Sequence, residues 1–169
     1  MVTGDLVVPP RPAGPHTRAP TALGMDLGGP FDRGRGGPGG WLILYEPELH
    51  FGGEVVVPDL AGWRRDQGVP DLGRAHFSLA PHWACEVLSP GTTKHDRGPK
   101  ADVYAREGVE HLWLVDPLAK LLEAFALSGD EWRRLGAWSD EAAVRVPPFD
   151  AIVLELAALW VTTSSATGA

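Results

Sequence analysis

The stretch that decides the fold covers residues 82–117 and reads HWACEVLSPGTTKHDRGPKADVYAREGVEHLWLVDP. Residues 82–88 are almost continuously apolar and close at a Ser-Pro-Gly turn, which predicts a strand covered on both faces. Residues 93–107 predict a helix that ends at Gly108, and residues 111–115 predict a second buried strand. This strand, helix, strand order predicts a right-handed crossover between parallel neighbours.

Outward from this unit, short apolar runs separated by turn residues predict the strands of a meander and a hairpin. The runs are residues 5–8, 41–45, 50–51, 55–57 and 60–63 before it, and residues 121–127 and 131–136 after it. Apolar residues spaced by four from Ala19 to Leu27 predict a helix with Pro20 in its first turn, and residues 154–160 predict a last short helix. The fold class is therefore α+β with a mixed sheet. We expect one domain over residues 1–161 and a flexible tail over residues 162–169.

Composition limits the function classes. The 169 residues carry a formal net charge of −7, so the chain as a whole does not attract phosphate or an anionic membrane surface. Its single cysteine, Cys85, excludes an internal disulfide and a Cys-rich zinc site. No apolar run approaches the roughly 20 residues of a membrane span. We expect a cytoplasmic protein that makes no membrane contact.

Glu86 is the residue that suggests chemistry, because it is a lone acid inside an apolar strand. Burying a carboxylate costs several kcal/mol unless a cation or hydrogen bonds compensate it. A second acid, Asp59, follows Val55-Val56-Val57-Pro58 and also lies at a junction of apolar strands. The alternatives remain open: Glu86 in a buried ion pair with an arginine, or with its side chain reaching the strand end, and Asp59 in an ordinary Pro-Asp turn.

On the predicted helix, Asp96, Lys100 and Tyr104 are spaced i, i+4, i+8 and share one face. This face directs Lys100 towards the strand end that carries Glu86. The alternative is a solvent-facing lysine paired with Asp96. Lys94 competes for the same role, although it precedes the first secure turn.

Two carboxylates and a lysine around one pocket favour metal-assisted phosphodiester hydrolysis. Asp59 and Glu86 would bind Mg²⁺, with Mn²⁺ as a substitute, and the backbone carbonyl of Val87 is a further candidate ligand. The cation would lower the pKa of a bound water and neutralise charge on the phosphate. Lys100 would position that water or stabilise the developing negative charge.

These residues also carry a family resemblance. The ordered motifs are Val57-Pro58-Asp59, residues 85–92 (CEVLSPGT), residues 96–100 (DRGPK), Tyr104-Ala105, Gly108-Val109 and residues 112–117 (LWLVDP). Together they resemble the Uma-two family of restriction endonucleases, a branch of the PD-(D/E)xK nuclease superfamily, from about residue 5 to residue 160. The resemblance implies a restriction-endonuclease-like fold with Asp59 and Glu86 as metal ligands and Lys100 as the lysine of the site. Asp5 resembles the acid of the family's Gly-Glu-Leu element, an additional active-site carboxylate.

The chain also departs from the superfamily pattern. The lysine usually lies two residues beyond the second acid, where this chain has Leu88, and the family places it on the following helix as Lys100 does. Family members usually have about one more helix before the Gly-Glu-Leu strand, so we expect either a trimmed start or a partner that supplies the missing cover. Residues 33–40 form a Gly-rich loop whose two arginines suit a phosphate backbone, although a disordered surface loop is the preferred reading.

The working hypothesis is a Mg²⁺-dependent endonuclease that hydrolyses DNA as a homodimer. The alternative is a catalytically inactive protein of the same fold, acting as a DNA-binding or protein-interaction module, and a more remote one is a hydrolase of small phosphoesters. No two of the six histidines have metal-ligand spacing in the sequence, which argues against a zinc site.

Overall fold

The computed structural model describes residues 14–161, and its centre is a six-stranded mixed sheet in the order β1-β4-β5-β6-β7-β8. The strands are β1 Trp41–Tyr45, β4 Leu60–Arg64, β5 Trp83–Val87, β6 His111–Asp116, β7 Leu121–Ser128 and β8 Glu131–Ser139. Only β5 and β6 run parallel, as the strand, helix, strand pattern predicts, and every other neighbouring pair is antiparallel. The α+β class with a mixed sheet is thereby confirmed.

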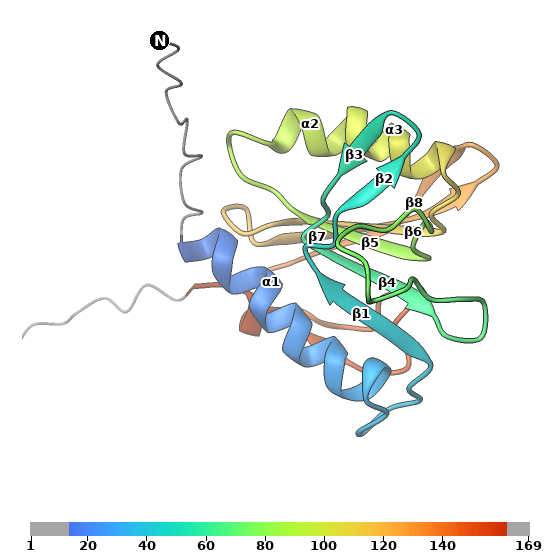
Figure 1. Ribbon diagram of the computed structural model, residues 1–169. Helices are drawn as coiled ribbons and strands as arrows, with labels where there is room; N and C mark the ends of the chain where they lie inside the picture. Colours follow the sequence, from blue (N-terminus) through green and yellow to red (C-terminus); the bar gives the residue numbers. More distant parts are fainter. Residues whose placement is uncertain (1–13, 162–169) are drawn as a thin grey trace, which may run out of the picture.

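Helices cover both faces of this sheet (Figure 1). Helix α1, Gly14–Leu27, packs on one face, and the short helices α2, Thr93–Arg97, and α3, Pro99–Arg106, lie over the other. Alternating residues of β5 face the two layers: Trp83 and Cys85 belong to the core that includes α1, and Ala84 belongs to the core that includes α3. This double coverage explains why β5 reads as a continuous apolar run.

A hairpin outside the sheet packs against α3 (Figure 1). It consists of β2, Leu49–Phe51, and β3, Glu54–Val56, paired antiparallel. Buried residues Leu49, Phe51 and Val56 share one core cluster with residues of α3. The exposed pair of Arg106 with Glu54 adds a second link between the hairpin and the helix.

Four details of the sequence prediction need correction. The predicted meander is interrupted, because β1 pairs directly with β4 and the hairpin stands apart from the sheet. The last predicted helix is instead the strand β10, Leu154–Glu155, which pairs with β9, Ala143–Val144, followed by a 3₁₀ turn over Leu156–Leu159. Helix α1 begins before the predicted start, which places Pro20 in its interior, and it continues as a π-helical turn over Gly28–Asp32.

The predicted helix over residues 93–107 is also two helices, because the chain breaks at Gly98. Gly98 has φ −113° and ψ −98°, outside the helical region, and Pro99 then opens α3 at its first turn. The predicted strand at residues 5–8, the site candidate Asp5 and the tail 162–169 lie outside the described residues. No helix within residues 14–161 is long and apolar enough to cross a bilayer.

Candidate active site

The predicted acids come together where β4 begins and β5 ends. These two strands are antiparallel, with Leu60 opposite Cys85. Extending this register by one residue places Asp59 opposite Glu86, on the face of the sheet that α3 covers. Two distant segments therefore bring their carboxylates to one edge of the sheet, as the sequence pattern suggests.

Asp59 directly precedes β4, and its side chain extends the hydrogen bonding between β4 and β5 by one bond. Its Oδ2 accepts a hydrogen bond from the backbone N–H of Val87 at 2.7 Å. Burial raises the pKa of Asp59, although the Val87 hydrogen bond and the nearby charges of His16 and Lys100 act in the opposite direction. Asp59 is thus not the solvated acid of an ordinary turn.

Glu86 is the most deeply buried acid of the site, with 2% of its surface exposed. Its Oε1 lies 2.7 Å from Lys100 Nζ and accepts a hydrogen bond from the Tyr104 hydroxyl at 2.5 Å. Burial raises the pKa of Glu86 to about 8, because desolvation outweighs the favourable charge and hydrogen bonds of these two neighbours. Of the alternatives left open for Glu86, the structure therefore shows a buried contact with a basic side chain, which is a lysine rather than an arginine.

Lys100 contacts one acid of the helix layer, Asp96, and one acid of the sheet, Glu86. Its ammonium contacts Glu86, lies 3.3 Å from Asp96 Oδ1 and donates to the carbonyl oxygen of Val57 at 3.3 Å. Burial would lower the pKa of Lys100, but the charges and hydrogen bonds of Glu86 and Asp96 raise it. Only 12% of the side chain is exposed, so Lys100 faces the site, whereas its competitor Lys94 is exposed.

The broken helix explains how these side chains reach the strand end. Asp96 is in α2 and Lys100 is in α3, so their i, i+4 contact spans the break at Gly98. A salt bridge of 2.5 Å between Arg97 and Glu123 of β7 holds α2 against the sheet. This arrangement buries Asp96, which is 3% exposed, beside the Lys100 ammonium.

His16 belongs to the same region, and the sequence analysis did not assign it. Its Nε2 donates to the carbonyl oxygen of Val87 at 2.6 Å, so Val87 contacts Asp59 through its N–H and His16 through its carbonyl. A carbonyl oxygen has two lone pairs, so this contact leaves Val87 able to accept a second partner. The signal was present: His16 extends the apolar stripe of Ala19 and Leu23 by one turn, which directs its imidazole towards the sheet.

The charge of this cluster fits a divalent cation. Asp59, Glu86 and Asp96 supply three carboxylates, and Lys100 supplies one ammonium. A doubly charged ion would bring these four side chains to neutrality and would offset the burial that raises the pKa values of Asp59 and Glu86. All the donors are oxygens, which Mg²⁺ and Mn²⁺ prefer.

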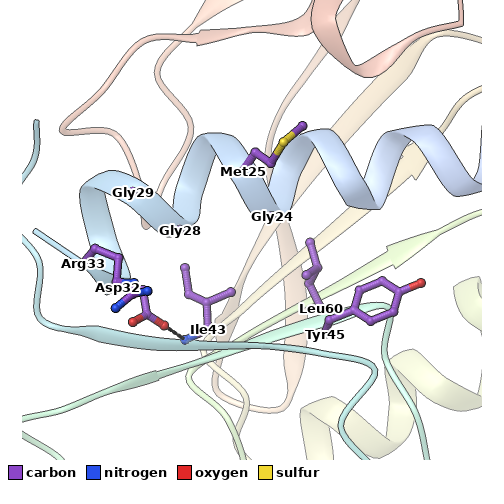
Figure 2. A pocket seen from close by; sticks show the side chains of 9 residues that line it. All are labelled: Gly24, Met25, Gly28, Gly29, Asp32, Arg33, Ile43, Tyr45 and Leu60. Atoms are coloured by element: carbon purple, nitrogen blue, oxygen red, sulfur yellow. Dashed lines mark hydrogen bonds between the residues drawn. The ribbon is translucent and has the colours of Figure 1, made fainter. Parts of the chain in front are cut away.

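An open cavity of about 410 Å³ lies between α1 and β1 (Figure 2). Leu60, which directly follows Asp59, and Tyr45, its partner on β1, line it together with Met25 and Arg33. None of the three predicted site residues lines this cavity. The Gly-rich loop 33–40 comes after the C-terminal end of α1 and its π-helical turn, whereas His16 is in the first turn of α1. Arg33 and Arg35 are exposed, so the loop carries its two positive charges on the surface.

Comparison with known proteins gives two positive findings. The Uma2 family model, described as "Putative restriction endonuclease", matches residues 1–158. The fold is similar to a crystal structure from Anabaena variabilis that is described as a putative nuclease belonging to DUF820, with a TM-score of 0.71 and 20% sequence identity. That similarity covers 94% of this chain and 87% of the other. No curated protein matches the sequence.

Proposed function

The chain belongs to the Uma2 family, and on this premise we propose that it is a divalent-metal-dependent nuclease that hydrolyses DNA phosphodiester bonds. The observation that carries the proposal is the convergence of Asp59, Glu86 and Lys100 at one edge of the sheet. Glu86 and Lys100 are in direct contact, and Asp59 follows the register of the paired strands. Buried acids with raised pKa values beside a lysine are typical of functional sites.

In this proposal Asp59 and Glu86 bind Mg²⁺, or Mn²⁺ in its place, and the Val87 carbonyl is an additional ligand. The bound ion supplies positive charge against the scissile phosphate and lowers the pKa of water. Lys100 provides a positive charge next to the acids, where it orients the attacking water or stabilises the negative charge that develops on the phosphate. Asp5 is proposed as a further carboxylate of this set.

The neighbouring side chains hold these groups in place. The Tyr104 hydroxyl donates to one oxygen of Glu86, and Asp96 pairs with the Lys100 ammonium. His16 orients the Val87 carbonyl through its hydrogen bond. Such support matters because small displacements of reacting groups cost large factors in rate.

Plasmid cleavage in Mg²⁺ or Mn²⁺ tests this proposal, with the wild type compared to Glu86→Ala and the isosteric Glu86→Gln. We expect both variants to lose at least about 100-fold in cleavage rate, because each removes a proposed metal ligand. Glu131→Gln is a matched control, since Glu131 is an exposed acid on β8. Equal cleavage by the wild type and both Glu86 variants would contradict the proposal.

The alternative of an inactive nuclease fold is separated by calorimetry. It is favoured by the net charge of −7, which gives the chain no global attraction to DNA. A protein of this kind would bind no Mg²⁺, and Asp59→Asn would leave the titration unchanged. The nuclease proposal expects binding that Asp59→Asn weakens.

We also propose that residues 1–161 form one domain and that the active protein is a homodimer. Two copies related by a twofold axis suit cleavage of both strands of a duplex, and cyclic dimers are the commonest assembly. A chain that ends at residue 161 should keep the melting temperature of the full chain and sediment as a dimer at micromolar concentration. A lower melting temperature would contradict the domain boundary, and a monomer would contradict the assembly.

A further inference from the structure

A second group of metal-binding side chains lies at the base of the β2–β3 hairpin. Glu48 and His50 flank Leu49 at the start of β2, and His76 comes from the irregular segment between β4 and β5. Their candidate ligand atoms all lie within 4.8 Å of one another. Within residues 14–161, this is the only trio of His, Cys, Asp or Glu side chains that meets this distance.

The backbone fixes the three residues relative to one another. Phe77 donates its N–H to the carbonyl of Glu48 at 2.9 Å and accepts the N–H of His50 at 2.8 Å, which makes a parallel bridge between Leu49 and Phe77. Leu49 is fully buried, so Glu48 and His50, one residue to either side of it, lie on the outer face of the strand. The bridge places His76 beside Glu48.

The side chains already contact one another. His50 Nε2 lies 2.6 Å from Glu48 Oε1, and the rings of His50 and His76 stack with centroids 3.9 Å apart and an interplanar angle of 18°. An ion pair explains the first contact but leaves His76 without a charged partner of its own in the trio. The nitrogen lone pairs lie in the ring planes, so the rings must turn to share one ion. The half-buried His50 and the exposed His76 have room to do so.

We propose that Glu48, His50 and His76 form a binding site for Zn²⁺ or a chemically similar transition-metal ion. Two imidazole nitrogens and one carboxylate oxygen suit Zn²⁺, whereas Mg²⁺ prefers oxygen ligands alone. Because zinc is usually four-coordinate, these three ligands would leave its fourth position for a water molecule. The site is separate from the Asp59–Glu86 pair, and the ion would fasten the segment between β4 and β5 to the hairpin that packs on α3. The spacing of histidines in the sequence gives no sign of it, because the bridge between residues 49 and 77 brings them together.

Calorimetric titration with Zn²⁺ tests the proposal on tag-free protein stripped of metal at about pH 7.5, where imidazoles are mostly neutral. The starting protein is the double variant Asp59→Asn with Glu86→Gln, so that the other acids do not contribute. We expect one zinc ion per chain, and we expect His76→Ala or His50→Ala in this background to weaken binding about tenfold or more. His95→Ala is the matched control, because His95 is an exposed histidine of α2 outside the trio.

Thermal unfolding gives a second readout that does not depend on nuclease activity. In the Asp59→Asn, Glu86→Gln background, Zn²⁺ should raise the melting temperature of the starting protein and of its His95→Ala variant, but not that of its His76→Ala variant. If His76→Ala and His95→Ala bind zinc with the same stoichiometry and affinity, the proposal that His76 is a zinc ligand is wrong. Loss of all zinc binding in the starting double variant would also overturn it, because the ion would then occupy the Asp59–Glu86 pair.

Discussion

At the scale of single residues, Glu86 has the largest energetic consequence. Its carboxyl is 2% exposed and its pKa is about 8, so most of the metal-free protein holds a proton on Glu86 at neutral pH. Lys100 and Tyr104 reduce this effect without removing it. A cation bound by Glu86 would displace that proton, so protons and metal compete for the same group.

This pKa predicts how stability depends on pH in protein treated with EDTA. An unfolded Glu86 titrates near its ordinary value of 4.5, whereas the folded group titrates near 8. Between these values the folded state binds a proton that the unfolded state has released, so the free energy of unfolding falls as pH rises and levels off above about 8. The contribution of Glu86 is roughly 2 to 5 kcal/mol across this window.

Urea unfolding from about pH 5 to pH 8.5 measures it, with Glu86→Gln as the variant. Asp59 adds to the decline because its pKa is also raised, and His82 and His111 oppose it because burial lowers their pKa values. The difference between the wild type and Glu86→Gln isolates the contribution of Glu86. The free energy of unfolding should fall less steeply with pH in Glu86→Gln than in the wild type. Parallel pH profiles for the two proteins would show that Glu86 titrates normally.

The residue pattern pointed to some members of this side-chain cluster and missed others for a physical reason. Glu86 and Asp59 are visible because acids are rare inside apolar strands, and Lys100 is visible because it shares a helix face with Asp96. His16 lies in a helix on the other face of the sheet. The apolar stripe of that helix directs His16 towards the sheet but does not show which strand its imidazole reaches. Residues that are unusual for their local segment can be predicted from the sequence. Contacts between distant segments can be identified only once the fold is known.

At the scale of elements, the break between α2 and α3 positions the site. Gly98 separates the helices, the Arg97–Glu123 salt bridge holds α2 on the sheet, and the Asp96–Lys100 contact joins the helices again. The sequence predicted a single helix here, because Gly98 and Pro99 can be read either as a break or as tolerated interior residues. The backbone at Gly98 resolves this ambiguity, since its ψ of −98° is incompatible with a continuous helix.

Gly98→Ala tests this role. A Cβ atom at Gly98 would lie 3.0 Å from the Lys94 carbonyl oxygen, so this carbonyl of α2 must give by a few tenths of an ångström. We expect a loss of about 1 to 2 kcal/mol of stability and a reduction of DNA cleavage by roughly tenfold, because Asp96 moves away from Lys100. Gly91→Ala is the matched control, because no atom lies within 4 Å of a Cβ there. Equal stability and cleavage in the two variants would rule out this role for the break.

At the scale of the whole molecule, the order of the strands creates the site. The connection between parallel β5 and β6 contains the helices that place Lys100 over the sheet. Antiparallel β4 brings Asp59 to the end of β5. The parallel pair followed from residues 82–117, but the insertion of β4 next to β5 did not, because strand order depends on long-range packing. The positions of the hairpin and of the proposed zinc-binding trio, both outside the sheet, also depend on long-range packing and could not be predicted from the sequence.

The central claim is that Asp59 and Glu86 bind one divalent cation beside Lys100. A crystal soaked in Mn²⁺ tests it most directly, through an anomalous difference map. We predict a peak bonded to carboxylate oxygens of both acids, which is absent from crystals of Glu86→Gln prepared in the same way. A map with Mn²⁺ bound at other positions, such as Glu48, His50 and His76, but with no peak between Asp59 and Glu86 would contradict the claim.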